Sequence, residues 1–354
     1  MKNVNYTDRY LRTLENVCGK MTEPEMFRGE ICMITGATGM IGSAVADLLL
    51  WSNRENRLGL KVLLAVRDKE KARRRFRFFR EGQDYELIGY QNGKEVSTKI
   101  CPDTIIHCAG NAHPNAYARE PVETLLGNVA GMYGILDFAR KNPKVGRVLY
   151  VSSSEVYGDR PGNELYKEED YSFVDILNPR ACCPSGKRAA ETLCSCYEKE
   201  YGVHSVIVRP GHIYGPTMTA TDSRAATQFI RNVLRGEPIL MKSAGLQRRS
   251  YCYVFDCASA ILTVLKKGAD AKAYNISNPQ GIVTIREFAE VLSHAAGLPL
   301  TYEKPDDQEA SGYNLMTSSA LDSRKLESLG WKGLYDTEAG IRDTLEIMES
   351  GVEE

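Results

Sequence analysis

The sequence predicts an α/β protein in which a doubly wound parallel sheet is followed by a smaller C-terminal lobe. One observation is that short apolar segments alternate with helix-like segments from residue 29 to residue 212. Such alternation is typical of a parallel sheet covered by helices on both faces. The other is that the first apolar segment runs directly into a glycine-rich turn and a second apolar-periodic segment. At 354 residues, the chain is long enough for both parts.

The composition is that of an ordinary globular protein, with 43% hydrophobic and 26% charged residues. A net charge of −1 gives no support for nucleic-acid binding, and we expect the basic residues 69–80 to lie on a solvated helix. The sequence shows neither a signal peptide nor an apolar run that could cross a bilayer. The ten cysteines lack the spacing of zinc sites or disulfide frameworks. We therefore expect a cytoplasmic protein with reduced thiols, no metal site and no membrane or nucleic-acid partner.

Residues 1–28 are expected to form a polar helical extension. An apolar stripe would run along one face of this helix, formed by Tyr10, Leu11, Leu14 and Val17. The stripe could dock a partner, or it could simply pack against the rest of the chain.

Residues 29–212 are predicted to form the domain that contains the parallel sheet. We expect its strands at residues 31–34, 61–66, 104–108, 147–152 and 203–208, and its clearest helices at 121–140 and 185–201. Beyond residue 212 the alternation loosens. There we predict a substrate-binding lobe built from residues 213–249 and 279–354, with segments near 250–278 returning to the main sheet.

The most informative stretch is the glycine-rich turn within residues 30–42, which read EICMITGATGMIG. Glycines let the backbone turn tightly and approach a pyrophosphate, which then rests on the N–H groups and positive dipole end of the following helix. Strand, glycine triplet and helix occur in the order that a Rossmann-like dinucleotide site requires. We therefore predict cofactor-binding residues at Gly36, Thr38, Gly39, Met40, Ile41 and Gly42.

Three further motifs follow later strands: VSSSEVYGD at 151–159, RACCPSGKRAAE at 180–191 and RPGHIYGP at 209–216. Together with the glycine turn, they resemble the extended short-chain dehydrogenase/reductase family, in its group of nucleotide-sugar epimerases and dehydratases. The resemblance extends over about residues 29–335, and it is nearest to UDP-glucuronate decarboxylases and dTDP-glucose 4,6-dehydratases. It implies oxidation of the sugar at C4 by a bound nicotinamide, followed by decarboxylation or 4,6-dehydration of the 4-keto sugar.

The resemblance also implies roles for individual residues. Ser153 would hydrogen-bond the reacting hydroxyl, and Glu155 would act at C5–C6 of the sugar. Lys187 would hold the nicotinamide ribose and lower the pKa of the catalytic base. Among substrate-binding residues, the resemblance places His113, Ser154, His212, Arg224 and Arg249. Arginine suits a diphosphate because its guanidinium makes paired hydrogen bonds, although Arg224 and Arg249 could instead form surface ion pairs.

One catalytic position departs from the family pattern. The family base is a tyrosine four residues before the lysine, and here that position is Cys183. A thiol has a reference pKa of about 8.5, against about 10 for a phenol, but it is too short to reach a hydroxyl placed for a tyrosine. Either Cys183 replaces a tyrosine in an otherwise complete site, or the protein has diverged. A divergent protein would use water, Ser153 or another residue, or it would have lost its redox activity.

The cofactor signal is mixed, and rival functions remain. Arg67 follows the second strand, where NAD enzymes usually carry an acidic residue. It could bind a 2′-phosphate, so NADP is an alternative to the NAD that hydride recycling favours.

A 4-epimerase and a catalytically silent NAD(P) or nucleotide-sugar binding protein are the alternative functions. The resemblance also implies a homodimer formed through residues 132–138 and 189–197.

Overall fold

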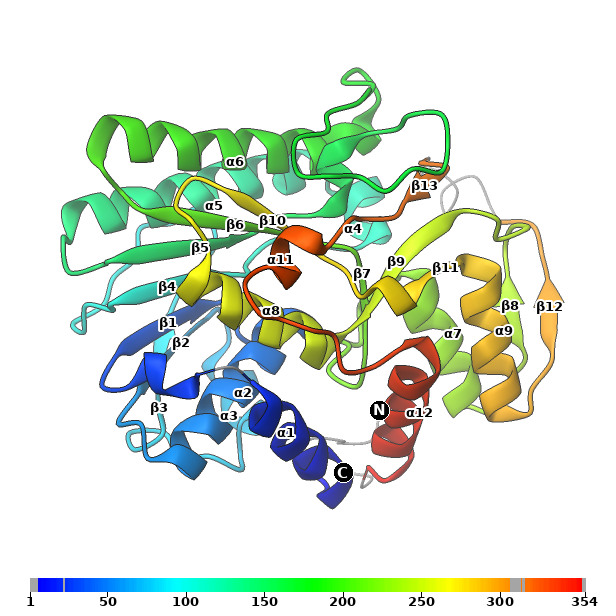
Figure 1. Cartoon of the computed structure of the whole chain (residues 1–354), viewed down its shortest axis with the longest axis horizontal. Helices are drawn as coiled ribbons and strands as arrows, with labels where there is room; N and C mark the ends of the chain where they lie inside the picture. The colour runs from blue at the N-terminus through cyan, green and yellow to red at the C-terminus, as the bar shows by residue number, and fades with distance from the viewer. Residues whose placement is uncertain (1–5, 22, 306–312, 314–315, 352–354) are drawn as a thin grey trace.

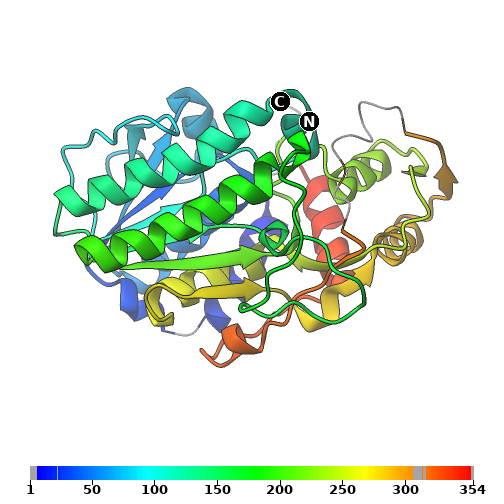
Figure 2. The same cartoon turned by 90° about the horizontal axis from the view of Figure 1, so that it is seen from above.

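The computed structural model describes residues 6–21, 23–305, 313 and 316–351 (Figures 1 and 2). A seven-stranded sheet with the order β10-β6-β5-β4-β1-β2-β3 lies at its centre, and every neighbouring pair of strands is parallel. The strands of this sheet are β1 (Ile31–Thr35), β2 (Lys61–Val66), β3 (Tyr85–Gly89), β4 (Thr104–His107), β5 (Arg147–Val151), β6 (Ser205–Pro210) and β10 (Ala273–Ile276). The predicted α/β class with a doubly wound parallel sheet is confirmed.

Helices cover both faces of the sheet. The helices around it are α2 (Met40–Asn56), α3 (Lys69–Arg75), α4 (Pro114–Arg119), α5 (Pro121–Lys141), α6 (Cys182–Tyr201) and α8 (Val254–Lys267). Helices α5 and α6 lie side by side over one face, while α2 and α8 pack together over the other (Figures 1 and 2). Alternate residues of β1 point into the two cores, Met33 toward α5 and α6 and Ile34 toward α2 and α8. None of the described helices is both long and apolar enough to span a bilayer.

The later part of the chain adds two small sheets beside the carboxyl edge of the main sheet (Figure 1). Their strands are β7 (His212–Tyr214), β8 (Ile239–Met241), β9 (Arg248–Tyr253), β11 (Ile282–Thr284), β12 (Leu300–Tyr302) and β13 (Ser318–Ser319). The helices of this part are α7 (Ala225–Leu234), α9 (Ile285–Ala296), α11 (Arg324–Glu327) and α12 (Thr337–Glu349). The predicted domain boundaries at 28, 212, 249 and 279 stay a prediction.

The N-terminal helix α1 (Asp8–Lys20) packs against α2, α8 and α12. Tyr10, Leu14 and Val17 of the predicted stripe are fully buried in the main core. The expectation that this stripe could dock a partner is therefore wrong for these three residues, because internal packing already covers them.

A buried polar cluster fixes α1 to the sheet domain. Asp47 of α2 is fully buried, and it accepts a 2.6 Å hydrogen bond from the Tyr6 hydroxyl and further bonds from the Tyr10 hydroxyl and the Arg75 guanidinium. Arg75 also lies over the Tyr6 ring, 5.5 Å from its centroid. The expectation that residues 69–80 form a solvated helix is therefore wrong for Arg75, whose charge is neutralised inside the protein.

The other end of the α1 contact lies on α12. Asp343 of α12 accepts hydrogen bonds from Thr13 at 3.0 Å and from the Tyr253 hydroxyl at 2.5 Å. Arg9 pairs with the same carboxylate at 2.7 Å. Helix α1 thus links an early helix of the sheet domain to the last helix of the described chain.

Replacing Asp47 with Asn should strongly destabilise the protein. The substitution leaves the buried Arg75 guanidinium without a counter-charge, which typically costs about 3–5 kcal/mol in the free energy of unfolding. Urea unfolding followed by circular dichroism measures this cost. As a control on the same helix, the exposed Glu55→Gln should change stability by no more than about 0.5 kcal/mol. Equal stability of Asp47→Asn and Glu55→Gln would contradict the assigned role of the cluster.

Candidate active site

The glycine turn lies where the strand order of the main sheet reverses, between β1 and β4. Gly36 follows β1 with a φ of +66°, and a Cβ placed on it would lie 2.8 Å from the backbone nitrogen of Ala109. A Cβ on Gly42 would lie 2.4 Å from the Gly36 carbonyl oxygen. Side chains at these two positions would therefore force the turn, the start of α2 and the loop after β4 apart.

The start of α2 is open to an anion. Gly39 is its N-cap residue, and no described side chain caps the helix there. The first N–H groups of α2 are therefore available to a pyrophosphate, and the turn fits the dinucleotide that the glycine pattern predicts. Thr38 and Ile41 are partly exposed at this turn, whereas Met40 is buried and its carbonyl accepts a 2.9 Å hydrogen bond from Thr217.

Arg67 lies directly after β2, next to the strand that carries the glycine turn. Its side chain is exposed and makes no hydrogen bond or ion pair with any described residue. It is thus available to either a ribose hydroxyl or a 2′-phosphate, and the NAD or NADP choice is not decided by its contacts.

Lys187 and Cys183 lie one turn apart on α6. The Lys187 ammonium donates a 2.8 Å hydrogen bond to the Val151 carbonyl at the end of β5, and it lies 4.7 Å from the centroid of the Tyr150 ring. Burial lowers the pKa of Lys187. Burial also raises the pKa of the Cys183 thiol to about 12, with the nearby Glu155 carboxylate adding to the effect. Cys183 is therefore a neutral thiol at neutral pH, and it is a poor base as well as a short one.

The segment after β5 carries the predicted acid–base residues. Ser153 Oγ accepts a 3.2 Å hydrogen bond from the Glu155 N–H at the start of the short helix η2 (Ser154–Tyr157). Ser154 itself is buried. Both oxygens of the Glu155 carboxylate are held by Arg180 of η3 (Pro179–Ala181), at 2.6 and 2.9 Å.

Sequence reasoning missed Arg180, although it opens the motif that also contains Cys183 and Lys187. An arginine at the start of that motif is the only signal the sequence offers. Its partner, Glu155, lies in another motif 25 residues earlier, so only the fold shows that the two are paired.

His212, Arg224 and Arg249 come together beside the glycine turn. His212 Nδ1 is buried without a hydrogen-bond partner among the described residues. Burial first, and then the charges of Arg249 and Arg224, hold the pKa of His212 well below its usual range. Arg224 is paired with Asp222, with Nε 3.0 Å from one carboxylate oxygen, and the buried Arg249 donates to the Met316 carbonyl at 2.9 Å. An anion placed among these three residues would meet positive charge and little water.

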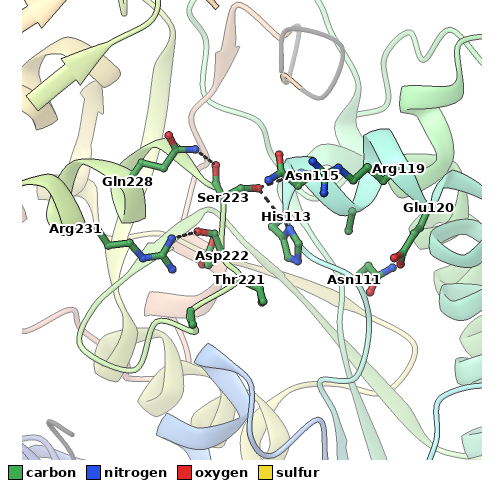
Figure 3. Close-up of a pocket in the computed structure, with 12 residues that line it drawn as sticks. Asn111, His113, Asn115, Arg119, Glu120, Thr221, Asp222, Ser223, Gln228 and Arg231 are labelled. Carbon is green, nitrogen blue, oxygen red and sulfur yellow. Dashed lines mark hydrogen bonds between the residues drawn. The ribbon is translucent and has the colours of Figure 1, made fainter. Parts of the chain in front are cut away.

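His113 lines a cavity of about 560 Å³ next to that group, together with Asp222, the partner of Arg224 (Figure 3). The cavity lies between α4 and the segment before α7, where His113 Nδ1 is 3.4 Å from Ser223 Oγ. Figure 3 shows that Asn115 approaches the same hydroxyl, and its backbone N–H donates to it at 3.0 Å. Neither Lys187 nor Glu155 lines this cavity. The structure thus brings His113 near Arg224, whose charge also acts on His212.

His107 lies beneath the site and was also missed by sequence reasoning. It ends β4, with Nδ1 2.7 Å from the Thr35 hydroxyl and its ring stacked on Tyr150. Burial, helped by the charge of Lys187, lowers the pKa of His107 to about 3. A neutral imidazole therefore supports the aromatic ring on which the Lys187 ammonium rests.

Comparison with known proteins agrees with this geometry. Residues 32–277, more than half of the chain, match the NAD dependent epimerase/dehydratase family. UDP-glucuronic acid decarboxylase 3 of Arabidopsis thaliana is 31% identical over 322 residues, which is 90% of this chain and 87% of that protein. The chain belongs to the NAD dependent epimerase/dehydratase family. This confirms the resemblance to the nucleotide-sugar epimerase and dehydratase group.

Solved structures of the family share the fold. UDP-glucuronic acid 4-epimerase of Bacillus cereus, solved with UDP-glucuronic acid and NAD, has a TM-score of 0.75 at 18% identity, covering 90% of this chain and 99% of that one. dTDP-glucose 4,6-dehydratase of Bacillus anthracis, solved with NAD, has a TM-score of 0.72 at 20% identity, covering 90% and 96%. At such identities the likeness establishes the Rossmann-like fold.

The buried neutral histidines should make the protein sensitive to acid. Because the pKa of His107 is about 3 in the folded state and about 6.5 in an unfolded chain, only the unfolded state takes up protons as pH falls below 6.5. The free energy of unfolding should therefore fall between pH 6.5 and pH 4, with His212 acting in the same direction. Urea titrations across this range should show a shallower pH slope for His107→Gln, whereas the exposed His294→Gln should keep the wild-type slope. Identical slopes for all three proteins would contradict this account.

Proposed function

We propose that the protein is an NAD-dependent nucleotide-sugar enzyme that oxidises C4 of an NDP-hexose or NDP-hexuronate and then decarboxylates or dehydrates the 4-keto sugar. The main observation in support is that Arg180 holds the carboxylate of Glu155, which lies two residues after Ser153. Similarity to a UDP-glucuronic acid decarboxylase over most of both chains supports the decarboxylation branch. The nearest alternative is a 4-epimerase, which the fold likeness to the Bacillus cereus epimerase keeps open.

The residues present fit the cofactor that the family name implies. The glycine turn would hold the pyrophosphate on the open start of α2, and the buried Lys187 would hold the nicotinamide ribose. When bound, the dinucleotide supplies the hydride acceptor at C4. We keep NAD as the first choice and NADP as the alternative, because Arg67 has no partner among the described residues.

On the sugar side, each residue would act in its observed place. Ser153 would orient the C4 hydroxyl, while Glu155 would move a proton at C5–C6, in the orientation that Arg180 fixes. A ketone at C4 acidifies the C5 hydrogen and makes a carboxylate at C5 a good leaving group, so one oxidation permits either outcome. Arg224, Arg249 and His212 would meet the diphosphate.

The test is incubation with UDP-glucuronate, UDP-glucose or dTDP-glucose, each with NAD⁺ or NADP⁺, followed by mass analysis. Loss of carbon dioxide indicates a decarboxylase, loss of water a dehydratase, and unchanged mass with altered stereochemistry an epimerase. Glu155→Gln should lower the rate of the C5–C6 step by about 10²–10⁴-fold, because it removes the proton-transfer group. Glu164→Gln, at an exposed position a few residues further on, should leave that rate unchanged.

The rival reading, a silent binding protein, is tested with Cys183→Tyr. Turnover by the wild-type protein excludes it. If neither protein turns over any nucleotide sugar while both bind one by calorimetry, the proposed enzyme activity is wrong and the binding-protein reading is correct.

A cytoplasmic location stays a prediction from the cysteine content.

We also infer that the protein is a homodimer. Helices α5 and α6 form an outer layer on one face of the sheet (Figure 2). Val122, Leu126 and Tyr133 of α5 are 60%, 58% and 53% exposed, and apolar surface of this kind marks contact sites. Met132 of the expected 132–138 segment is buried against the sheet. The contact between subunits would therefore be made by the exposed residues of this helix, such as Tyr133.

The double variant Leu126→Glu, Tyr133→Glu should convert a dimer into a monomer in light scattering at micromolar concentration, because charges would be buried in the contact. The matched variant Leu246→Glu, at another exposed apolar position, should stay dimeric. A wild-type protein that is already monomeric would overturn the inference.

A further inference from the structure

Tyr117 brings a phenol to the position where the family tyrosine is missing. It lies on α4, the short helix after β4, and only 7% of its side chain is exposed. Its ring forms a small buried cluster with Cys182 and Cys183 at the start of α6. A side chain from a different element thus covers the thiol that replaces the family base.

The groups around Tyr117 are residues of the candidate active site. Tyr117 packs against Cys183, and it lies close enough to the Glu155 carboxylate for that charge to raise the pKa of the phenol. The Arg180 guanidinium, which holds Glu155, lies 4.5 Å from the centroid of the Tyr117 ring. Such a cation–π contact stabilises the position of the ring beside Arg180.

We infer that Tyr117 supplies the phenol for proton transfer at the sugar C4 oxygen, in place of the tyrosine that Cys183 has replaced. The inference rests on the proposed function and extends it. In the oxidation step, the C4–H bond would break and its electron pair would leave as hydride, for which a bound dinucleotide would supply the acceptor. The C4 hydroxyl proton would pass to the oxygen of the Tyr117 phenolate, which becomes a phenol, and the C4–O bond would become a carbonyl. When the hydride returns, the proton returns with it.

The other groups near this position suit the task less well. The Cys183 thiol is buried, neutral and shorter than a phenol by several ångströms. The Lys187 ammonium is already bonded to the Val151 carbonyl, and the Ser153 oxygen accepts from the Glu155 N–H. Tyr117 is therefore the phenol that shares a buried cluster with Cys183.

The use of Tyr117 as the base, in place of a tyrosine at position 183, affects how the rate of C4 oxidation depends on pH. Burial first, and then Cys183 and Glu155, raise the pKa of Tyr117 well above its ordinary value, while Arg180 opposes the shift. The remaining groups that surround it are the Cys182 thiol and the Arg224 guanidinium. A base with a raised pKa is deprotonated only at high pH, so the rate of C4 oxidation should rise with pH through the alkaline range.

The deciding variant is Tyr117→Phe, which keeps the ring on Arg180 and removes only the hydroxyl. With the nucleotide sugar that the wild-type protein turns over, kcat for cofactor reduction should fall by about 10²–10⁴-fold. KM and the calorimetric affinity for NAD⁺ should stay within about threefold, and the residual activity should lose its alkaline rise. Tyr302→Phe, at an exposed position on β12, should behave as wild type.

A second background separates this inference from the proposed function. In Cys183→Tyr, the new phenol one turn before Lys187 should take over, so adding Tyr117→Phe should cost less than about tenfold in kcat. Wild-type kcat in Tyr117→Phe, or equal losses in both backgrounds, would overturn the role of Tyr117 and leave the proposed function standing. Turnover by Cys183→Tyr but not by the wild-type protein would overturn the role of Tyr117 and show that this chain itself is catalytically silent. Absence of turnover in every variant would overturn both.

Discussion

The close approach of two backbone segments at the carboxyl edge of the sheet is the constraint on which the rest of the structure depends. The turn after β1 lies so near the loop after β4 that Gly36 could not carry a side chain without displacing that loop, and Gly42 packs as closely against the Gly36 carbonyl. This approach opens the start of α2 to a pyrophosphate. It also fixes where the loop after β4 leaves the sheet, and that loop leads to α4 and hence to Tyr117. The same close approach thus shapes the turn that would bind the cofactor and determines where Tyr117 lies on α4.

Patterns that are local in the sequence predicted the fold well. The buried strands β2 and β6 contain the continuous apolar runs VLLAV and VIV, which are typical of strands covered on both faces. Edge strand β3 was not predicted, because its short YELIG sequence is interrupted by Glu86 and ends in Gly89, and so carries neither a long apolar run nor a regular alternation. Helix α6 begins at Cys182, three residues before the predicted start. Pro184 stands in its first turn, where proline is tolerated.

The site was predicted where residues share a motif and missed where they depend on distant partners. Ser153, Glu155 and Lys187 stand at fixed spacings after strands, so the sequence names them. Arg75 and Arg180 look like ordinary basic residues until the fold brings Asp47 and Glu155 to them. The clustering of Tyr117 with Cys183 joins two segments more than sixty residues apart, and no periodicity within either segment carries that information.

The N-terminal helix has a consequence for how the chain is made. The buried face of α1 is covered by α2, α8 and α12, which all follow it in the chain. Until α8 and α12 have been synthesised, part of this apolar face has no cover, so it is exposed to other molecules during synthesis. Helix α1 thus completes its packing only after helices that lie more than 200 residues further along the chain have been made.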